Sequence, residues 1–112
     1  MKFDKSLLSG STRMLVLSLL QDRDEYGYEI INQLALRSEN AFQMKEGTLY
    51  PVLHSLERDG FVIAYEQETD AGRKRRYYHL TDKGRRELAQ QKEQWKTFSS
   101  SVDMVLNQRC PV

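Results

Sequence analysis

A run of cations followed by aromatic residues is the part of this sequence best suited to contact a polyanion. Four consecutive basic residues, Arg73 to Arg76, precede the β-type run Tyr77 to Leu80, and Thr81 can then cap a helix. The segment from Gly72 to Arg86 carries seven cations and one anion, although the whole chain has a net charge of only +1. Charge concentrated in this way is typical of nucleic-acid binding. The alternative is an ordinary solvated basic loop.

A polar helix face precedes the basic run. We expect a helix from about Glu46 that stops at Gly60, with one buried stripe at i, i+3, i+4 and i+7 formed by Leu49, Val52, Leu53 and Leu56. Its other faces carry small, hydrogen-bonding or cationic groups, as a recognition helix does in the major groove. The predicted DNA-binding residues are Lys45, Gly47, Thr48, Tyr50, Pro51, His54, Ser55 and Arg58 on this helix, and Arg73, Lys74, Arg75 and Arg76 at the tip of the following turn. An ordinary polar face of an amphipathic helix is the alternative.

The elements that position these residues can be predicted from periodicity. Apolar spacing predicts a first helix over residues 11–21 and a second around residues 28–35, separated by a polar break with solvated acids at residues 21–25. After the third helix, residues 61–67 and 75–80 are rich in β-formers and read as a hairpin with its turn at residues 70–72. Three helices followed by a two-stranded ribbon give the element order of a winged helix-turn-helix.

Alternation along the hairpin predicts which of its side chains enter the core. We expect Phe61, Ile63 and Tyr65 to share one face with Tyr78 and Leu80, because side chains of a strand alternate between its two faces. Tyr77 and His79 then point to the other side. Tyr78 is therefore predicted to be a core residue rather than a DNA contact.

A long last helix is predicted to follow Thr81. Residues at 3-4-3-4-3 spacing form a coiled-coil-like seam of Leu88, Gln91, Trp95, Phe98, Val102 and Val105. A helix of roughly 25 residues extends nearly 40 Å and overhangs a three-helix core, so its apolar stripe needs another surface. A second copy of the chain is the simplest supplier, and we predict a homodimer through this seam. The expected fold class is α+β, mostly α: a winged helix-turn-helix domain over residues 1–80, then a C-terminal dimerisation helix and short tail over residues 81–112.

Composition and motifs exclude several other classes of protein. The most apolar run, Met14 to Leu20, falls short of the roughly 20 residues of a membrane span, and the N-terminus is too broken for a signal peptide, so we expect a cytoplasmic protein without membrane contact. The single Cys110 cannot form an intrachain disulfide and lies in a tail expected to fray. His54 and His79 lie on different elements, and no catalytic, phosphate-loop or metal-binding motif is present. We predict no catalysis, no cofactor and no metal.

The joint pattern of four segments resembles the PadR family of bacterial transcriptional regulators. The segments are Tyr26-Gly27-Tyr28-Glu29-Ile30, Gly47-Thr48-Leu49-Tyr50-Pro51-Val52-Leu53, Leu56-Glu57-Arg58-Asp59-Gly60-Phe61 and Gly72 to Gly84. The resemblance implies a repressor of the short subfamily, with a single C-terminal dimerisation helix, that leaves its operator when a signal arrives. Because the two recognition helices of a dimer would enter successive major grooves, we expect this operator to be a pseudo-palindromic site in double-stranded DNA. It also implies DNA contacts by Tyr50 and its neighbours and backbone contacts by the wing. Lys74 stands where many relatives carry proline.

The resemblance also suggests an effector site. Some short members bind flat hydrophobic compounds in a pore between subunits, where a tryptophan of the last helix stacks on the ligand. Trp95 is the matching position here, and Phe98 and Leu88 lie on the same stripe. This implies a hydrophobic aromatic small-molecule effector; the alternative is that Trp95 only packs the dimer seam. A second functional class also stays open, because winged helices can serve as protein-interaction modules without specific DNA binding.

Overall fold

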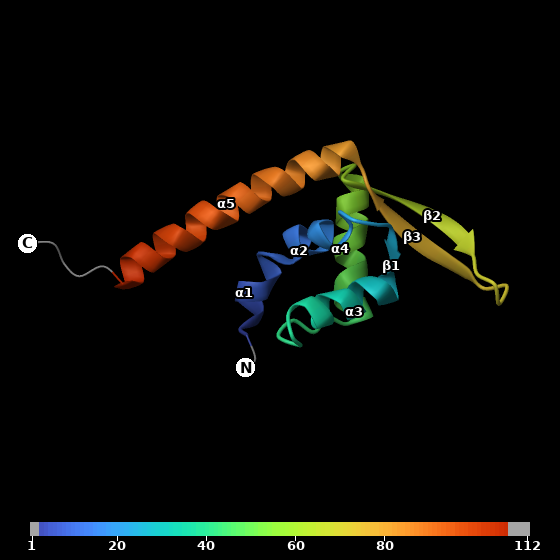
Figure 1. The fold of residues 1–112 in the computed structure, drawn as a ribbon, viewed down its shortest axis with the longest axis horizontal. Coiled ribbons are helices and arrows are strands. Elements are labelled where there is room, and N and C mark those ends of the chain that lie inside the picture. The colour runs from blue at the N-terminus through green and yellow to red at the C-terminus, as the bar shows by residue number, and fades with distance from the viewer. Residues whose placement is uncertain (1–2, 108–112) are drawn as a thin grey trace, which may run out of the picture.

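The computed structural model describes residues 3–107 and contains five helices and three strands in that range (Figure 1). Their order is α1 (Lys5–Ser9), α2 (Thr12–Leu19), β1 (Glu25–Tyr26), α3 (Gly27–Arg37), α4 (Glu46–Arg58), β2 (Val62–Glu68), β3 (Lys74–Leu80) and α5 (Asp82–Asn107). The winged helix-turn-helix with a long C-terminal helix is thus confirmed. Cys110 and the end of the predicted tail lie outside the described residues.

Two short elements, α1 and β1, were not predicted from the sequence. The first predicted helix is present as α2, but the five-residue α1 precedes it, and the two-residue β1 adds a third strand to the expected ribbon. Both are too short to show a repeating apolar pattern. The sheet is antiparallel with the order β1-β3-β2, so β3 is its central strand.

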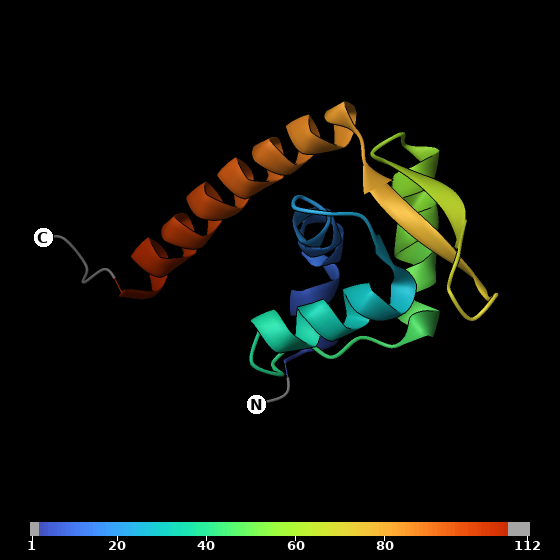
Figure 2. The same cartoon turned by 45° about the vertical axis from the view of Figure 1, so that its right-hand side comes forward.

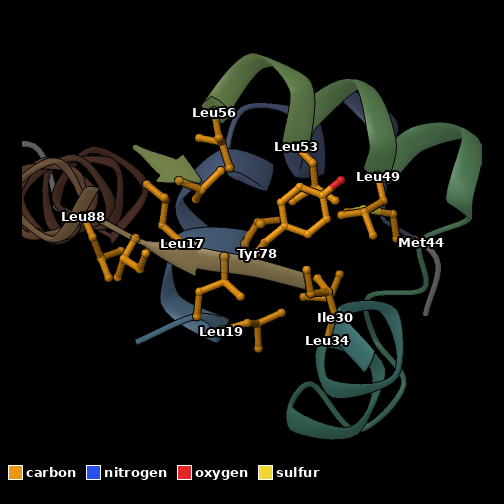
Figure 3. Close-up of a cluster of buried hydrophobic side chains, with 14 residues drawn as sticks. Leu17, Leu19, Ile30, Leu34, Met44, Leu49, Leu53, Leu56, Tyr78 and Leu88 are labelled. Carbon is orange, nitrogen blue, oxygen red and sulfur yellow. The ribbon is translucent and has the colours of Figure 1, made fainter. Parts of the chain in front are cut away.

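The core lies between the helices and the inner face of the sheet (Figure 3). Tyr78 projects from the central strand into the space bounded by α2, α3 and α4, and its side chain is fully buried. Fully buried residues of the three helices and the sheet surround it: Val16, Leu17, Ile30, Leu49, Leu53, Leu56, Val62 and Leu80. The predicted stripe of α4 and the core position of Tyr78 are both confirmed.

The predicted face of β2 is wrong by one residue. Val62 pairs with Leu80 and Ala64 with Tyr78, and directly opposed residues share a face of the sheet. Val62 and Ala64 therefore enter the core, while Ile63 is 54% exposed. The error arose because Phe61 is not part of the strand: its N–H donates to the carbonyl of Leu56 and closes the end of α4.

Glu25 corrects the prediction that residues 21–25 form a solvated break. It pairs with Tyr78 in the sheet and is only 1% exposed. Arg23 Nε lies 3.3 Å from Glu25 Oε1, whereas Oε2 has no hydrogen-bond partner among the described residues. Burial raises the pKa of Glu25, because a charged carboxylate is disfavoured away from water.

Replacing Glu25 with glutamine should therefore stabilise the fold at pH 7. A carboxyl group whose pKa is raised by folding contributes most to the free energy of unfolding at pH values below its pKa in the unfolded chain. This contribution is lost as pH rises through its pKa in the folded protein. The free energy of unfolding of Glu25→Gln should exceed that of the wild type by on the order of 1 kcal/mol at pH 7 and should equal it near pH 4. Urea denaturation at both pH values measures this, with the exposed Glu66→Gln as control. An equal change at both pH values would contradict the burial argument.

The start of α5 is fixed to the head. The Thr81 Oγ1 accepts a hydrogen bond of 3.0 Å from the N–H of Gly84, which confirms Thr81 as the cap, and it lies 2.8 Å from the carbonyl oxygen of Gly60. From this joint α5 runs away from the head, and the molecule measures 69 × 31 × 21 Å along its principal axes (Figures 1 and 2). Within residues 3–107, no helix has the length and apolar character needed to cross a membrane.

Candidate nucleic-acid interface

The exposed face of α4 presents most of the predicted contact residues. Buried Leu49, Leu53 and Leu56 hold one side of α4 against the core. The opposite side is exposed and carries Lys45 (the residue preceding the helix), Gly47, Thr48, Tyr50, Pro51, His54 and Arg58. Seven of the eight predicted residues of this helix therefore reach solvent. The N-terminal half offers hydroxyl and cationic groups without an apolar patch, which is chemistry suited to DNA.

Ser55 departs from the prediction because its hydroxyl has an intramolecular partner. Arg13 of α2 donates through Nη1 to Ser55 Oγ and through Nη2 to Asp59 Oδ2 at 2.8 Å. The hydrogen bond from Arg13 lowers the pKa of Asp59. Arg13 also lies over the ring of Phe61, 5.6 Å from its centroid. The C-terminal end of α4 is thus tied to α2, a link that sequence reasoning missed because 42 residues separate Arg13 from Ser55.

Tyr50 packs against the start of α3. A Cβ placed on Gly27 would lie 2.8 Å from the Tyr50 hydroxyl oxygen. The Tyr50 ring therefore occupies the space that a side chain at Gly27 would need, although the residue as a whole remains 36% exposed. This contact places the first turns of α3 and α4 side by side.

The tip of the β2–β3 hairpin, or wing, carries two of the four predicted cations. Arg73 and Lys74 are exposed there, beside Gly72, whose positive φ of 78° makes the turn. The prediction that Arg75 and Arg76 also lie at the tip is wrong. Both belong to the body of β3, where alternation sends their side chains to opposite faces.

Each of these two strand arginines contacts another part of the head. The guanidinium of Arg75 lies over the Tyr26 ring, 4.4 Å from its centroid. Arg76 Nη2 lies 3.2 Å from Glu57 Oε2 near the end of α4, which connects the wing to that helix. Arg73 and Lys74 have no comparable contact within residues 3–107, so their charges are available to a ligand.

The outer face of the sheet is held together by aromatic and charged side chains. Tyr77 stacks on Tyr65 and meets Tyr26 edge-on, with centroid distances of 5.7 and 5.5 Å. Tyr65 donates to Asp24 Oδ2 at 2.6 Å, and His79 Nδ1 lies 2.7 Å from Asp24 Oδ1. Burial works against ionisation of Asp24, but these two hydrogen bonds hold its pKa below the usual value, and the bond to Asp24 raises the pKa of Tyr65 to about 12. Tyr77 and His79 point away from the core, as predicted.

The wing and α5 leave the head in opposite directions, with α4 between them (Figure 1). In the turned view, the wing tip lies toward the same end of the head as the first turn of α4 (Figure 2). The first turn of α4 and the tip of the wing, which both carry exposed polar or cationic residues, therefore lie toward the same end of the head. Such an arrangement can place a helix in a groove while the wing contacts the flanking backbone.

The predicted seam of α5 divides into a buried and an exposed part. Leu88 is 1% exposed and belongs to the core of its own head, so its assignment to a subunit interface or ligand site is corrected. Gln91 is half-buried, whereas Trp95 and Phe98 on the same face are 50% and 62% exposed. Only the first part of the stripe, from Leu88 to Gln91, packs against the helices of the head. Beyond Gln91 its apolar side chains, including Val102 and Val105, are exposed in the part of the protomer that the structure describes.

An open concavity of about 540 Å³ lies between α5 and the N-terminal helices. Trp95 and Phe98 form its apolar wall, opposite Met14 and Arg13 of α2. Its other lining residues are Gly10, Ser11, Glu87, Gln91 and Gln94. Arg13 thus borders this concavity and also holds the end of α4. Among residues 3–107, no cluster of His, Cys, Asp or Glu is arranged to hold a metal ion.

Comparison with known proteins connects this geometry to a family of regulators. The model of the transcriptional regulator PadR-like family matches residues 16–90. The transcriptional regulator Rv3488 of Mycobacterium tuberculosis is 30% identical over 92 residues, which are 82% of each chain. A PadR family transcriptional regulator from Eggerthella lenta superposes with a TM-score of 0.83 at 30% identity, covering 94% of this chain and 89% of that one. A PadR-like transcriptional regulator from Bacillus cereus superposes with a TM-score of 0.79 at 28% sequence identity, covering 93% of this chain and 99% of that one.

Proposed function

Because the chain belongs to the PadR-like family of transcriptional regulators, we propose that it binds a pseudo-palindromic operator as a homodimer and represses transcription until a signal releases it. The observation that carries this proposal is the exposed polar face of α4, which a buried leucine stripe fixes beside a wing with two exposed cations at its tip. Enzymatic activity is no part of this function, because the family is one of regulators.

The proposed binding mode follows from the twofold symmetry of a dimer. Two α4 helices enter successive major grooves about 34 Å apart, and each wing contacts the adjacent phosphates. Lys45, Thr48, Tyr50 and His54 face the bases or the flanking phosphates in this arrangement. Arg73 and Lys74 contact the backbone, which positions the head without reading the sequence.

Removing the wing cations tests this assignment. The double substitution Arg73→Ala with Lys74→Ala should weaken binding to every duplex, because each cation that neutralises a phosphate adds an electrostatic term to the affinity. The slope of log affinity against log salt should fall in magnitude by about one for each phosphate that is no longer neutralised. Binding to random duplex DNA measured at several salt concentrations gives this slope.

A matched control comes from α5. Lys92→Ala removes a cation whose Nζ lies 3.3 Å from Gln21 Oε1, far from the wing, and should leave the slope unchanged. An unchanged slope in the wing variant would contradict the wing assignment. If the wild type itself binds duplex DNA poorly at low salt, the protein-interaction module becomes the better description.

The dimer is proposed to form through the exposed part of the α5 stripe. Residues 1–80 then act as the DNA-binding unit, and the helix that follows them acts as the dimerisation unit. The first turn of α5 is tied to the head by two hydrogen bonds, so the head should move with the helix. Lys83 Nζ donates to the carbonyl oxygen of Asp59 at 2.8 Å, and Arg85 Nη1 donates to the carbonyl oxygen of Gln21 at 3.2 Å. A signal that alters the packing of the two α5 helices would therefore change the distance between the recognition helices.

The concavity beside Trp95 is the proposed place for a hydrophobic aromatic effector. Its size and its apolar wall of Trp95 and Phe98 suit a planar ring, and the neighbouring glutamines offer polar contacts. Titration with a panel of planar aromatic compounds should quench the fluorescence of Trp95, which is the single tryptophan of the chain. Absence of quenching across a chemically varied panel would leave Trp95 as a packing residue of the dimer.

A further inference from the structure

We propose that Gly27 is a positioning residue for DNA recognition: its missing side chain sets the orientation of the Tyr50 ring on α4. This inference rests on the proposed function, in which α4 reads the operator. Its geometric basis is the contact between the two residues. A Cβ on Gly27 would meet the Tyr50 hydroxyl oxygen at 2.8 Å, Cζ at 3.2 Å and Cε1 at 3.5 Å.

Backbone conformation does not explain a glycine at this position. Gly27 is the first residue of α3, and its φ is not positive, in contrast to the φ of Gly60 and Gly72. Alanine is favoured over glycine in a helix by roughly 1 kcal/mol. The position is therefore compatible with a side chain as far as its backbone is concerned. What glycine supplies here is space, and Tyr50 fills that space.

The elements on both sides of this contact are fixed. The backbone before Gly27 is held in the sheet through the pairs Glu25 with Tyr78 and Tyr26 with Tyr77. Glu29 accepts a hydrogen bond of 3.3 Å from the N–H of Tyr26 and caps α3. On the other side, fully buried Leu49 anchors the turn of α4 that carries Tyr50.

An added methyl group at Gly27 must therefore displace the Tyr50 side chain. The ring is the softest part of the contact, because it is partly exposed and rotates about two side-chain bonds. When the added methyl group displaces it, the Tyr50 ring would turn away from residue 27 and toward the face of α4 that is proposed to enter the groove. The hydroxyl would then change its position relative to the bases, whereas the wing cations would keep theirs.

The substitution Gly27→Ala tests the proposal on the full chain. Duplexes are first selected by the wild type from a random library, so that a specific site is in hand. The variant should bind the selected duplex at least about tenfold more weakly, the scale of one hydrogen-bonded base contact. Its affinity for random duplex DNA should stay within about twofold, because wing contacts dominate nonspecific binding. Its melting temperature should not fall.

A double-mutant cycle with Tyr50→Phe identifies the route of the effect. Phenylalanine removes the hydroxyl oxygen, which would be the nearest atom to the new methyl group, and leaves the ring carbon Cζ at 3.2 Å. Gly27→Ala should therefore weaken binding of the selected duplex less in the Tyr50→Phe background than in the wild type. Ser100→Thr serves as the matched control, because it adds one methyl group at an exposed position of α5, away from α3 and α4. Ser100→Thr should bind the selected duplex like the wild type.

Three outcomes would overturn the inference. Unchanged binding of the selected duplex by Gly27→Ala would show that Gly27 does not set the position of Tyr50. An equal loss on selected and random DNA, with a lower melting temperature, would indicate a structural role instead. Additive effects in the cycle would mean that the methyl group acts on something other than Tyr50. Failure of the proposed function would look different, because the wild type would then select no duplex at all.

Discussion

Gly84→Ala is expected to destabilise the protein by about 3 kcal/mol or more, the upper end of the range for overpacked sites. A Cβ on Gly84 would overlap the backbone carbonyl oxygen of Phe61 and lie 2.7 Å from Leu80 Cδ1. Neither partner can yield easily, since the Phe61 carbonyl accepts a hydrogen bond from Thr81 and Leu80 is buried in the sheet. The melting temperature at fixed protein concentration should fall by at least about 10 °C.

Gly47→Ala provides the control for this substitution. It adds the same methyl group to a helix, but no atom lies within 4 Å of the new Cβ, and it should stabilise the chain by a few tenths of a kcal/mol or more. Calorimetry on both variants makes the comparison. A melting temperature of Gly84→Ala equal to that of the wild type would contradict the close approach of α5 to the end of α4, and with it the rigid joint between head and helix.

Placing glutamate at both Phe98 and Val102 should convert the protein into a monomer and weaken operator binding by at least about 100-fold. Both side chains belong to the exposed apolar stripe of α5, and carboxylates there would have to lose their water in a helix–helix interface. A monomer also loses the gain in effective concentration that links its two half-sites, which amounts to about two to four orders of magnitude. Light scattering and DNA binding, measured in parallel, check the two parts of this prediction.

Ser100→Glu is the control for the stripe. Ser100 is exposed on nearly the opposite side of α5, given about 100° per residue. A charge there should change neither the mass of the dimer measured by light scattering nor the affinity for the operator. A double variant of Phe98 and Val102 that stays dimeric would place the interface elsewhere. A monomeric variant with undiminished operator affinity would instead separate dimerisation from DNA recognition.

The helical part of this fold could be predicted because its elements are long and amphipathic. Helix α4 shows its buried stripe directly in the spacing of Leu49, Leu53 and Leu56, and Thr81 marks the start of α5 by its capping chemistry. The element order then identified the winged helix. The exposed face of α4 followed from the same periodicity, which is why most of its predicted contact residues do reach solvent.

What the sequence could not provide were contacts between distant residues. Glu25 lies in a stretch of acids and arginine that looks solvated, and only its pairing with Tyr78 explains its burial. The four wing cations look equivalent in the sequence, yet Glu57 and Tyr26 engage two of them. The inward face of β2 differs from the prediction by one residue because Phe61 precedes the strand and donates its N–H to the carbonyl of Leu56 in α4, and a shift of one residue exchanges the faces of the whole strand.

The surface proposed to bind DNA is smaller than the sequence predicts, and contacts within the head fix its position. The wing keeps Arg73 and Lys74 as exposed cations at its tip, whereas Arg76 joins the wing to the end of α4 and so fixes the angle between them. Arg13 fixes the same end of α4 to α2. The first turn of α4 rests on Gly27. Helix α4 is thus held at both ends by contacts with the rest of the head.

Selection of duplexes from a random-sequence library by the purified wild type tests whether the protein binds DNA sequence-specifically as a dimer. We expect enrichment of an inverted repeat whose half-sites lie about 10 base pairs apart, centre to centre, or a multiple of one helical turn. Affinity for the selected duplex should exceed that for random DNA by at least about 1,000-fold at physiological salt. Absence of any enriched sequence, with equal affinity for all duplexes, would contradict a dimeric, sequence-specific regulator.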